Sequence, residues 1–118
     1  MLPFDLPRTR SVALRDDTGR CAIGLDMSLS GRGERTHLAH ELGHCMTGSF
    51  YESGSPPWYR GKCEYKADKW AILHLVPRSA LLRAAAAGVT QRWQLAEMFG
   101  VTEEFMQKAI DFYNEVEK

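Results

Sequence analysis

The sequence predicts an α+β fold, in which a small N-terminal antiparallel β-hairpin packs on a core of helices. Two observations lead to this prediction. The turn-forming run Asp16-Asp17-Thr18-Gly19 separates two short segments that contain apolar residues, which is typical of a β-hairpin. The rest of the chain then reads as helical segments, several of them ended by glycine or proline. Strands followed by helices, rather than alternating with them, favour this class.

The length of 118 residues favours a single domain over 1–118. Fifteen basic and fifteen acidic residues leave no net charge, so bulk attraction to nucleic acid or to anionic lipid is not expected. The chain has no long uncharged apolar run, and we therefore expect no transmembrane helix. Residues 1–5 lack a basic region followed by an apolar stretch, so we expect no signal peptide and a cytoplasmic protein.

The N-terminal part of the chain is expected to be extended. Residues 1–10 are rich in proline and basic side chains and predict an extended lead-in. Residues 11–33 predict the hairpin and a loop rich in serine and glycine, with strands at 11–14 and 20–25.

Five helices are predicted over the remaining residues. A helix pair is expected in 34–77, and shorter helices in 78–118. Ser79, Thr90 and Thr102 can cap the last three helices, because their hydroxyl groups can accept a hydrogen bond from a first-turn N–H. The predicted extents are about 34–48, 61–76, 80–87, 90–99 and from 102 onward.

The segment His40-Glu41-Leu42-Gly43-His44 is the motif with the clearest chemical meaning. Residues four apart lie on one face of a helix, so His40 and His44 can bind one zinc ion. Glu41 lies about 100° round the helix from His40, close to the metal but directed past it. A carboxylate there can take a proton from water without binding the metal. We therefore predict His40 and His44 as metal ligands and Glu41 as the catalytic general base.

Gly43 predicts that another backbone approaches this turn closely, because glycine inside a helix costs about 1 kcal/mol relative to alanine. Ala67 and Ala71 of the next helix would allow such an approach. Leu38 and Leu42, which are four residues apart, are expected on the buried side of the first helix.

Catalytic zinc sites have three protein ligands and keep one position open for water. Glu64 and Asp68 are four residues apart and share a helix stripe with Ala67 and Ala71. We predict Glu64 as the third ligand, and Asp68 as the acceptor of a hydrogen bond from the outer N–H of a ligating histidine. The alternative is a solvated, ion-paired face with the lysines at 62, 66 and 69.

Several nearby residues have more than one interpretation. His37 lies one turn before His40 and could be a fourth ligand, although a partly buried or rim histidine is the favoured interpretation. The loop between the helix pair contains four further candidates, which either stabilise an oxyanion or fill apolar space. They are Tyr51, Trp58, Tyr59 and Arg60.

The three cysteines, Cys21, Cys45 and Cys63, are odd in number and have no signal peptide before them. This combination predicts free thiols in a reducing compartment. Cys45 follows one predicted ligand and Cys63 precedes another, which would suit a redox role. The favoured interpretation is that both are small, half-buried apolar residues.

Residues 95–106 are similar to a helix-turn-helix, with Ala96, Gly100 and Met106 where the tight turn needs them. However, 102–118 contains five acidic and two basic residues, a net charge that DNA phosphate would repel. We therefore expect the last helix to pack or to dock a partner, and expect no direct binding to nucleic acid.

Three segments together resemble the ImmA/IrrE metallo-endopeptidases of phages, mobile elements and bacteria. They are His40-Glu41-Leu42-Gly43-His44-Cys45, Gly48-Ser49-Phe50-Tyr51, and Glu64-x-x-Ala67-Asp68-x-Trp70-Ala71 ending in Leu75-Val76-Pro77. The resemblance covers roughly residues 10–115. It implies a gluzincin-like Zn²⁺ site on a zincin-like core, with His40, His44 and Glu64 as ligands and Glu41 as general base. It also implies cleavage of a partner protein, often a helix-turn-helix repressor encoded nearby.

The predicted function is therefore a zinc-dependent endopeptidase that cleaves an intracellular regulatory protein, with a transcriptional repressor as the expected substrate. An extended substrate could pair with the hairpin edge near 20–25. The alternative is a non-catalytic protein-interaction module with a structural or silent zinc site. Such a site would be closed by a fourth ligand, such as His37 or a cysteine.

Overall fold

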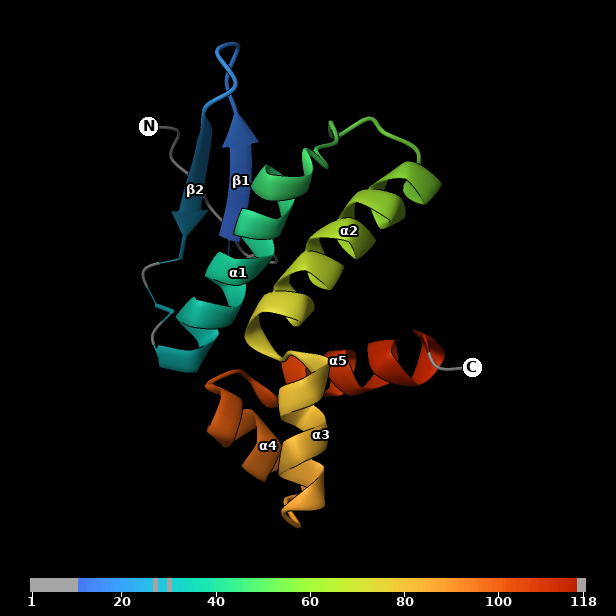
Figure 1. The fold of residues 1–118 in the computed structure, drawn as a ribbon. Coiled ribbons are helices and arrows are strands. Elements are labelled where there is room, and N and C mark those ends of the chain that lie inside the picture. Colours follow the sequence, from blue (N-terminus) through green and yellow to red (C-terminus); the bar gives the residue numbers. More distant parts are fainter. Residues whose placement is uncertain (1–10, 27, 30, 117–118) are drawn as a thin grey trace.

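The computed structural model of the chain describes residues 11–26, 28–29 and 31–116. Over these residues it has a two-stranded antiparallel sheet followed by five helices (Figure 1), which confirms the predicted α+β fold. The lead-in predicted for 1–10 lies outside the described residues. Among the described helices, none combines the length and the apolar character that crossing a bilayer requires.

The hairpin consists of β1 (Ser11–Arg15) and β2 (Cys21–Leu25). Asp16 organises the turn between them, since its carboxylate accepts a hydrogen bond from the Thr18 N–H at 2.9 Å. Gly19 adopts φ of 87°, a conformation that glycine reaches without a steric penalty. The turn chemistry that predicted the hairpin is therefore present in the structure.

The helix pair consists of α1 (Gly31–Thr47) and α2 (Pro57–Leu75), and both helices begin earlier than predicted. α2 starts with Pro57, where the missing N–H costs nothing because first-turn N–H groups have no intrahelical partner. The loop between the helices is accordingly shorter than the predicted 49–62 segment. Figure 1 shows α1 beside both β1 and α2, so α1 lies at the centre of this half of the molecule.

Gly43 is the point of closest approach between α1 and α2. A Cβ atom added at Gly43 would overlap the carbonyl oxygen of Ala67 and would lie 2.9 Å from the Ala67 Cα atom. Ala67 and Ala71 are both fully buried. These contacts confirm the prediction that a second backbone packs against this turn.

We expect Gly43→Ala to destabilise the protein by roughly 2 kcal/mol, because the added methyl group must push the two helices apart. The loss should occur even though alanine favours a helix over glycine by about 1 kcal/mol. Gly61→Ala is the matched control, since Gly61 also lies within a helix but a Cβ atom there meets nothing within 4 Å. Urea unfolding of both variants measures the difference. Equal stability of the two variants would contradict the packing described here.

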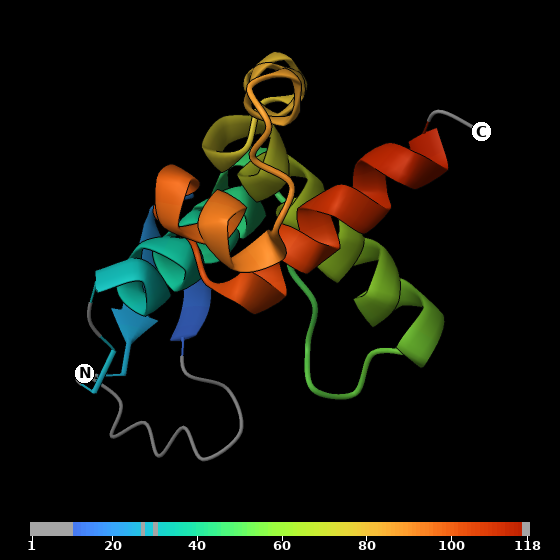
Figure 2. The same ribbon diagram turned by 90° about the horizontal axis from the view of Figure 1, so that it is seen from below.

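The remaining helices are α3 (Arg78–Ala86), α4 (Arg92–Phe99) and α5 (Glu103–Val116). Figure 2 shows α4 and α5 lying across the α1–α2 pair. α4 ends at Gly100, which adopts the left-handed conformation with φ of 68°.

Of the three predicted helix caps, one is present. The Thr102 hydroxyl accepts a hydrogen bond from the Phe105 N–H at 3.1 Å. The cap positions of α3 and α4 are instead occupied by Pro77 and Gln91, neither of which makes a side-chain cap hydrogen bond. Ser79 and Thr90 were therefore wrongly predicted as caps. α3 begins at Arg78 and α4 at Arg92, so neither helix starts directly after the predicted cap.

The hydrophobic core lies where α3, α4 and α5 meet the α1–α2 pair. Tyr113 closes it, donating a hydrogen bond from its hydroxyl group to the Val76 carbonyl oxygen at 2.7 Å. The core consists of Ala39, Ala71, Ile72, Val76, Ala84, Leu95, Ala96, Val101, Phe105, Met106, Ala109 and Tyr113.

Hydrogen bonds fasten the start of α5 to α1. The Thr102 N–H donates to the Thr36 hydroxyl oxygen at 3.3 Å. The Arg35 guanidinium donates to the Gly100 carbonyl oxygen at 3.1 Å and also to that of Phe99. These contacts hold the first turns of α5 against the N-terminal half of α1.

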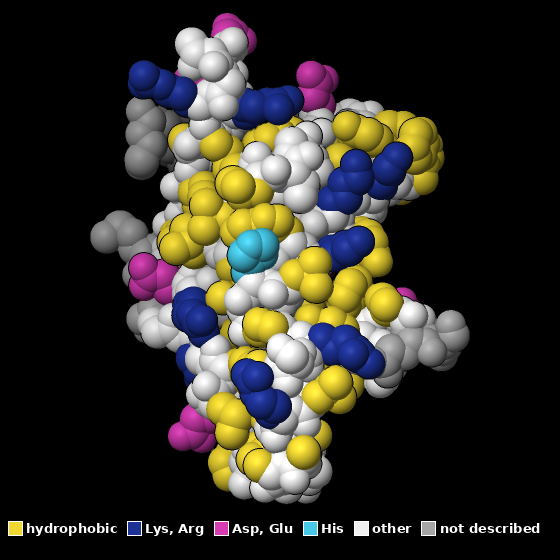
Figure 3. All heavy atoms as spheres, in the orientation of Figure 1, with side chains coloured by type: hydrophobic (Ala, Val, Ile, Leu, Met, Phe, Trp, Pro, Cys, Tyr) yellow, Lys and Arg dark blue, Asp and Glu magenta, His cyan; other side chains and the backbone are white. Residues whose placement is uncertain are grey.

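The buried face of α1 differs from the predicted one. Leu38 is 38% exposed and Leu42 is half-buried, so the expectation that these leucines mark the buried side was wrong. Figure 3 shows apolar side chains gathered on the surface over α1. The side of α1 that packs inward instead carries Thr36, Ala39, Glu41, Gly43 and His44.

A disulfide joins Cys21 of β2 to Cys45 of α1, with the Cα atoms 6.0 Å apart. The prediction of free thiols was therefore wrong for these two residues. The hairpin lies alongside α1 and brings together two cysteines that are 24 residues apart in sequence. Cys63 is unbonded and 3% exposed, in agreement with the favoured interpretation of a small buried residue. The odd cysteine count conceals one bonded pair, so it no longer supports a reducing compartment.

Candidate metal centre

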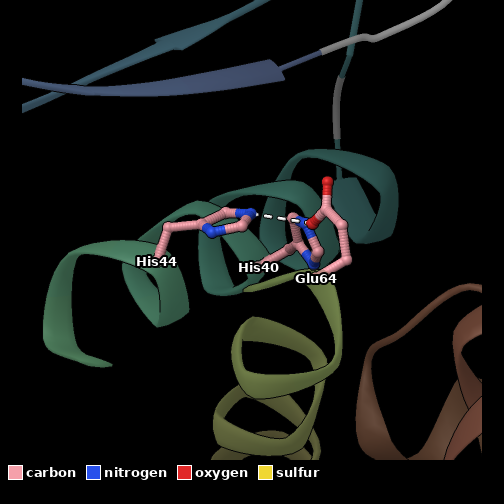
Figure 4. A group of neighbouring side chains, drawn as sticks. All are labelled: His40, His44 and Glu64. Carbon is pink, nitrogen blue, oxygen red and sulfur yellow. Dashed lines mark hydrogen bonds and ion pairs between the residues drawn. The ribbon is translucent and has the colours of Figure 1, made fainter. Parts of the chain in front are cut away.

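The three predicted ligands converge from two helices (Figure 4). Glu64 of α2 places its Oε2 atom 2.9 Å from His40 Nε2 and 2.8 Å from His44 Nε2, both of which project from α1. One candidate ligand atom from each residue lies within 4.8 Å of the others. The four-residue spacing sets the two histidines on one face, and the Gly43–Ala67 contact brings Glu64 within their reach.

The outer nitrogen atom of each histidine is also held. His40 Nδ1 lies 2.7 Å from Asp68 Oδ1, the position predicted for Asp68. His44 Nδ1 donates to the Ser49 carbonyl oxygen at 2.6 Å. Partners of this kind fix the orientation and the tautomer of a ligating histidine, so that the other nitrogen atom points at the metal.

The carboxylates make this site attractive to positive charge. Burial lowers the pKa of His40, but hydrogen bonds with Asp68 and Glu64 outweigh it and raise the pKa to about 10. Burial raises the pKa of Glu64, but hydrogen bonds from His40, His44 and Tyr51 hold that pKa well below its usual range. The raised pKa of His40 means that a proton competes with a metal ion for this imidazole.

Two imidazole nitrogens and one carboxylate oxygen are a donor set typical of catalytic zinc. Within the described part of the chain, the group able to hold a metal consists of His40, His44 and Glu64. His37 is not a member of this group, and its Nδ1 atom lies 3.0 Å from the Ser11 hydroxyl oxygen. The cysteines do not join it either, because Cys45 is in a disulfide and the Cys63 thiol donates to the Phe50 carbonyl oxygen. The residues present fit a zinc ion with one side left open.

That open side faces a cleft of about 620 Å³. β1 forms one wall of the cleft through Ser11, Val12, Ala13 and Leu14, whereas no residue of β2 lines it. The hairpin edge near 20–25, which was predicted to pair with a substrate, does not line this cleft. Figure 4 shows β1 crossing the side of α1 on which the ligands gather. The start of α5 lines the opposite part of the cleft with Thr102, Glu104, Phe105 and Lys108.

Glu41, the predicted general base, lines the same cleft and is only 4% exposed. Its Oε2 atom accepts a hydrogen bond from the Ser11 hydroxyl group at 2.5 Å. Glu41 is thus close to the ligands in sequence but is not one of the group that could hold the metal.

Of the four aromatic or basic candidates in and after the loop, Tyr51 is the one that lines the cleft. Its hydroxyl group donates to Glu64 Oε1 at 2.8 Å. Burial and the Glu64 carboxylate raise the pKa of Tyr51 to about 12, so it keeps its proton at neutral pH. Trp58 is 72% exposed, and the Tyr59 hydroxyl group donates to the Phe50 carbonyl oxygen.

Three residues of the site were not predicted from the sequence, namely Ser11, Ser49 and Lys108. Lys108 Nζ lies 3.2 Å from Asp68 Oδ2 and so supports the carboxylate that orients His40. Burial raises the pKa of Asp68, but His40 and Lys108 outweigh it and lower that pKa. The sequence around Ser11 and Lys108 has no local pattern that indicates a role in a metal site. Ser49 could not be recognised from its side chain, because it contacts His44 through its backbone carbonyl oxygen.

A pair of helices that carries a potential metal-ligand group beside a strand-walled cleft is typical of metallopeptidase-type domains. The chain belongs to the IrrE N-terminal-like domain family (peptidase M78), whose family model matches residues 2–111. The resemblance that the sequence motifs suggested is thereby confirmed. No match was found among curated proteins or among solved structures.

Proposed function

We propose that the protein is a zinc-dependent endopeptidase. The main support is that Glu41 and the group His40, His44 and Glu64 line one cleft, with Glu41 outside the ligand set. This is the arrangement that water activation requires, because the base must reach the attacking water without binding the metal. A purely structural metal site would need a fourth protein ligand.

When bound, zinc supplies Lewis-acid chemistry that acidifies water and polarises a peptide carbonyl. Glu41 takes the proton of the attacking water on its carboxylate and delivers it to the amine that leaves when the C–N bond breaks. Asp68 and the Ser49 carbonyl oxygen hold the rings of His40 and His44 in a fixed orientation while the proton is transferred. The buried position of Glu41 limits exchange of its proton with bulk water.

We further propose that the Tyr51 hydroxyl group stabilises the oxyanion that develops on the substrate carbonyl. Tyr51→Phe should then lower kcat about 100-fold with zinc content unchanged, since loss of one oxyanion donor commonly costs 10²–10³-fold. Tyr59→Phe is the matched control, because Tyr59 lies outside the cleft lining. If Tyr51→Phe weakened zinc affinity while the loaded enzyme kept its kcat, Tyr51 would instead be a support for Glu64.

The proposed substrate is an intracellular regulatory protein, namely a helix-turn-helix repressor whose gene lies near the gene of this protein. β1 supports an extended mode of binding, since it forms a wall of the cleft and, among the residues that the structure describes, pairs along one edge with β2. A segment of the substrate could add to the other edge by main-chain hydrogen bonds. Such binding demands an unfolded or exposed loop, which limits cleavage to few sites.

We expect site-limited cleavage of that repressor, and weak or no cleavage of casein, by the zinc-loaded protein. Selectivity of this kind follows if docking of a particular partner, rather than a deep side-chain pocket, selects the bond. Mass spectrometry of the products from both proteins provides the measurement, with Glu41→Gln protein as the inactive control. Rapid cleavage of casein at many sites, with the repressor intact, would identify a general peptidase and overturn the substrate assignment.

A further inference from the structure

We infer, on the basis of the proposed endopeptidase function, that Ser11 is a positioning residue for Glu41. It holds one carboxylate oxygen so that the other is presented to the cleft, and His37 fixes the direction of the Ser11 hydrogen bond. The geometry comes from two elements, since Ser11 begins β1 whereas His37 and Glu41 lie on α1. Nothing in the motif around His40 indicates that the base has a partner on the strand.

The hydrogen bond between Ser11 and Glu41 is short and buried. The Ser11 hydroxyl oxygen lies 2.5 Å from Glu41 Oε2, and the two residues are 2% and 4% exposed. Burial makes such a contact strong, because water does not compete for either group. Ser11 and Glu41 are 30 residues apart in sequence, so the contact forms only when the hairpin docks on α1.

The number of available protons fixes the direction of the two hydrogen bonds that Ser11 makes with His37 and Glu41. A serine hydroxyl group has one proton to donate, and an ionised carboxylate can only accept. Ser11 therefore donates to Glu41 Oε2, and its oxygen atom must accept from His37 Nδ1, which lies 3.0 Å away. His37 consequently carries hydrogen on Nδ1. His37 lines the cleft and is not a member of the group that could hold a metal.

The other oxygen atom of the Glu41 carboxylate, Oε1, remains available to accept a proton from water. Among the described residues, Ser11 is the hydrogen-bond partner of the Glu41 carboxylate, through Oε2. Glu41 itself lines the cleft, so we assign its Oε1 atom to the side that faces the cleft. Oε1 is thus the atom that takes the proton. A base held in this way does not have to be ordered anew for each reaction.

β1 is also the cleft wall along which an extended substrate would lie. Ser11 therefore links the wall that binds substrate to the group that activates water. A serine that only packed the strand against α1 would affect folding, but its effect on turnover would not depend on the Glu41 carboxylate. A double-mutant cycle separates these two roles.

The experiment compares Ser11→Ala, Glu41→Gln and the double variant on the protein substrate whose site-limited cleavage by the zinc-loaded wild-type protein is mapped above, with products read by mass spectrometry. We expect Ser11→Ala to lower kcat about 10- to 100-fold, the usual cost of losing a supporting hydrogen-bond partner, with KM and zinc content unchanged. Ser11→Thr, which keeps the hydroxyl group, should restore most of kcat. In the Glu41→Gln background, Ser11→Ala should cause no further loss.

A second readout does not depend on activity. The ¹⁵N spectrum of the histidine rings should show hydrogen on His37 Nδ1 at neutral pH, and Ser11→Ala should change that signal. Thr18→Ala is the control for a weakened hairpin, since Thr18 binds Asp16 at the exposed turn, far from the cleft lining. It should leave both kcat and the His37 signal unchanged.

The outcomes distinguish this inference from the proposed function. Full kcat in Ser11→Ala, together with an inactive Glu41→Gln, overturns the role of Ser11 and leaves the endopeptidase proposal standing. Turnover retained by Glu41→Gln overturns the endopeptidase mechanism and the role of Ser11 with it. If Ser11→Ala does not fold, the ¹⁵N spectrum of the wild-type protein tests the role of Ser11. A His37 ring without hydrogen on Nδ1 could not donate to Ser11, and this result would overturn the inference.

Discussion

Replacing Glu41 with glutamine is expected to lower peptide-bond cleavage by about 10²–10⁴-fold, the range that general-base catalysis contributes. The amide of glutamine has almost the shape of the carboxylate but cannot take a proton from water. Its oxygen atom can still accept the hydrogen bond from Ser11, so the hairpin should remain docked. Because Glu41 is outside the group that could hold the metal, zinc content should stay at the wild-type level.

The measurement is turnover of a substrate established for the wild-type protein, together with metal analysis of the same samples. Glu34→Gln is the matched control, because Glu34 lies in the first turn of α1, is exposed, and does not line the cleft. Near-normal turnover by Glu41→Gln would remove Glu41 from the role of general base. Loss of zinc from this variant would instead mean that Glu41 supports the metal.

Replacing Glu64 with alanine is expected to remove most of the bound zinc. The Glu64 carboxylate is the point on which both histidine Nε2 atoms converge, and two imidazoles alone are an incomplete site. Asp68→Asn should have a smaller effect, weakening zinc affinity or activity about 10–100-fold, because Asp68 acts through the outer nitrogen atom of His40.

Zinc affinity of both variants is measured by titration against a competing chelator. Glu97→Ala is a control for loss of an exposed carboxylate elsewhere in the fold. A larger loss of zinc affinity for Asp68→Asn than for Glu64→Ala would show that the two roles must be exchanged.

The ligand group could be predicted from the sequence because its geometry is local. Four-residue spacing sets His40 beside His44, and it sets Glu64 beside Asp68, whatever the rest of the chain does. Gly43 then indicated where the two helices touch, and the structure places Ala67 there. Each of these signals lies within one helix or one helix pair.

The parts that escaped prediction depend on contacts between distant segments. The Ser11–Glu41 hydrogen bond and the Cys21–Cys45 disulfide require the hairpin to lie on α1, and no local pattern specifies that docking. Lys108 reaches Asp68 only because α5 lies across the helix pair. Leu38 was misplaced for a related reason, since the inward side of α1 is occupied by small residues, Glu41 and His44 rather than by leucine.

The same division between local and distant contacts has a consequence for the order in which the chain assembles. The contact between His40 and Glu64 closes a loop of 24 residues, whereas the contact that docks α5, between Thr36 and Thr102, spans 66. Loop-closure entropy makes the longer closure more costly by about 0.9 kcal/mol. The ligand group therefore belongs to the early-forming α1–α2 unit together with the hairpin, whose Ser11–Glu41 contact spans only 30 residues, and α5 completes the cleft later. In this order of assembly, the group that could hold a metal is formed before the cleft beside it is complete.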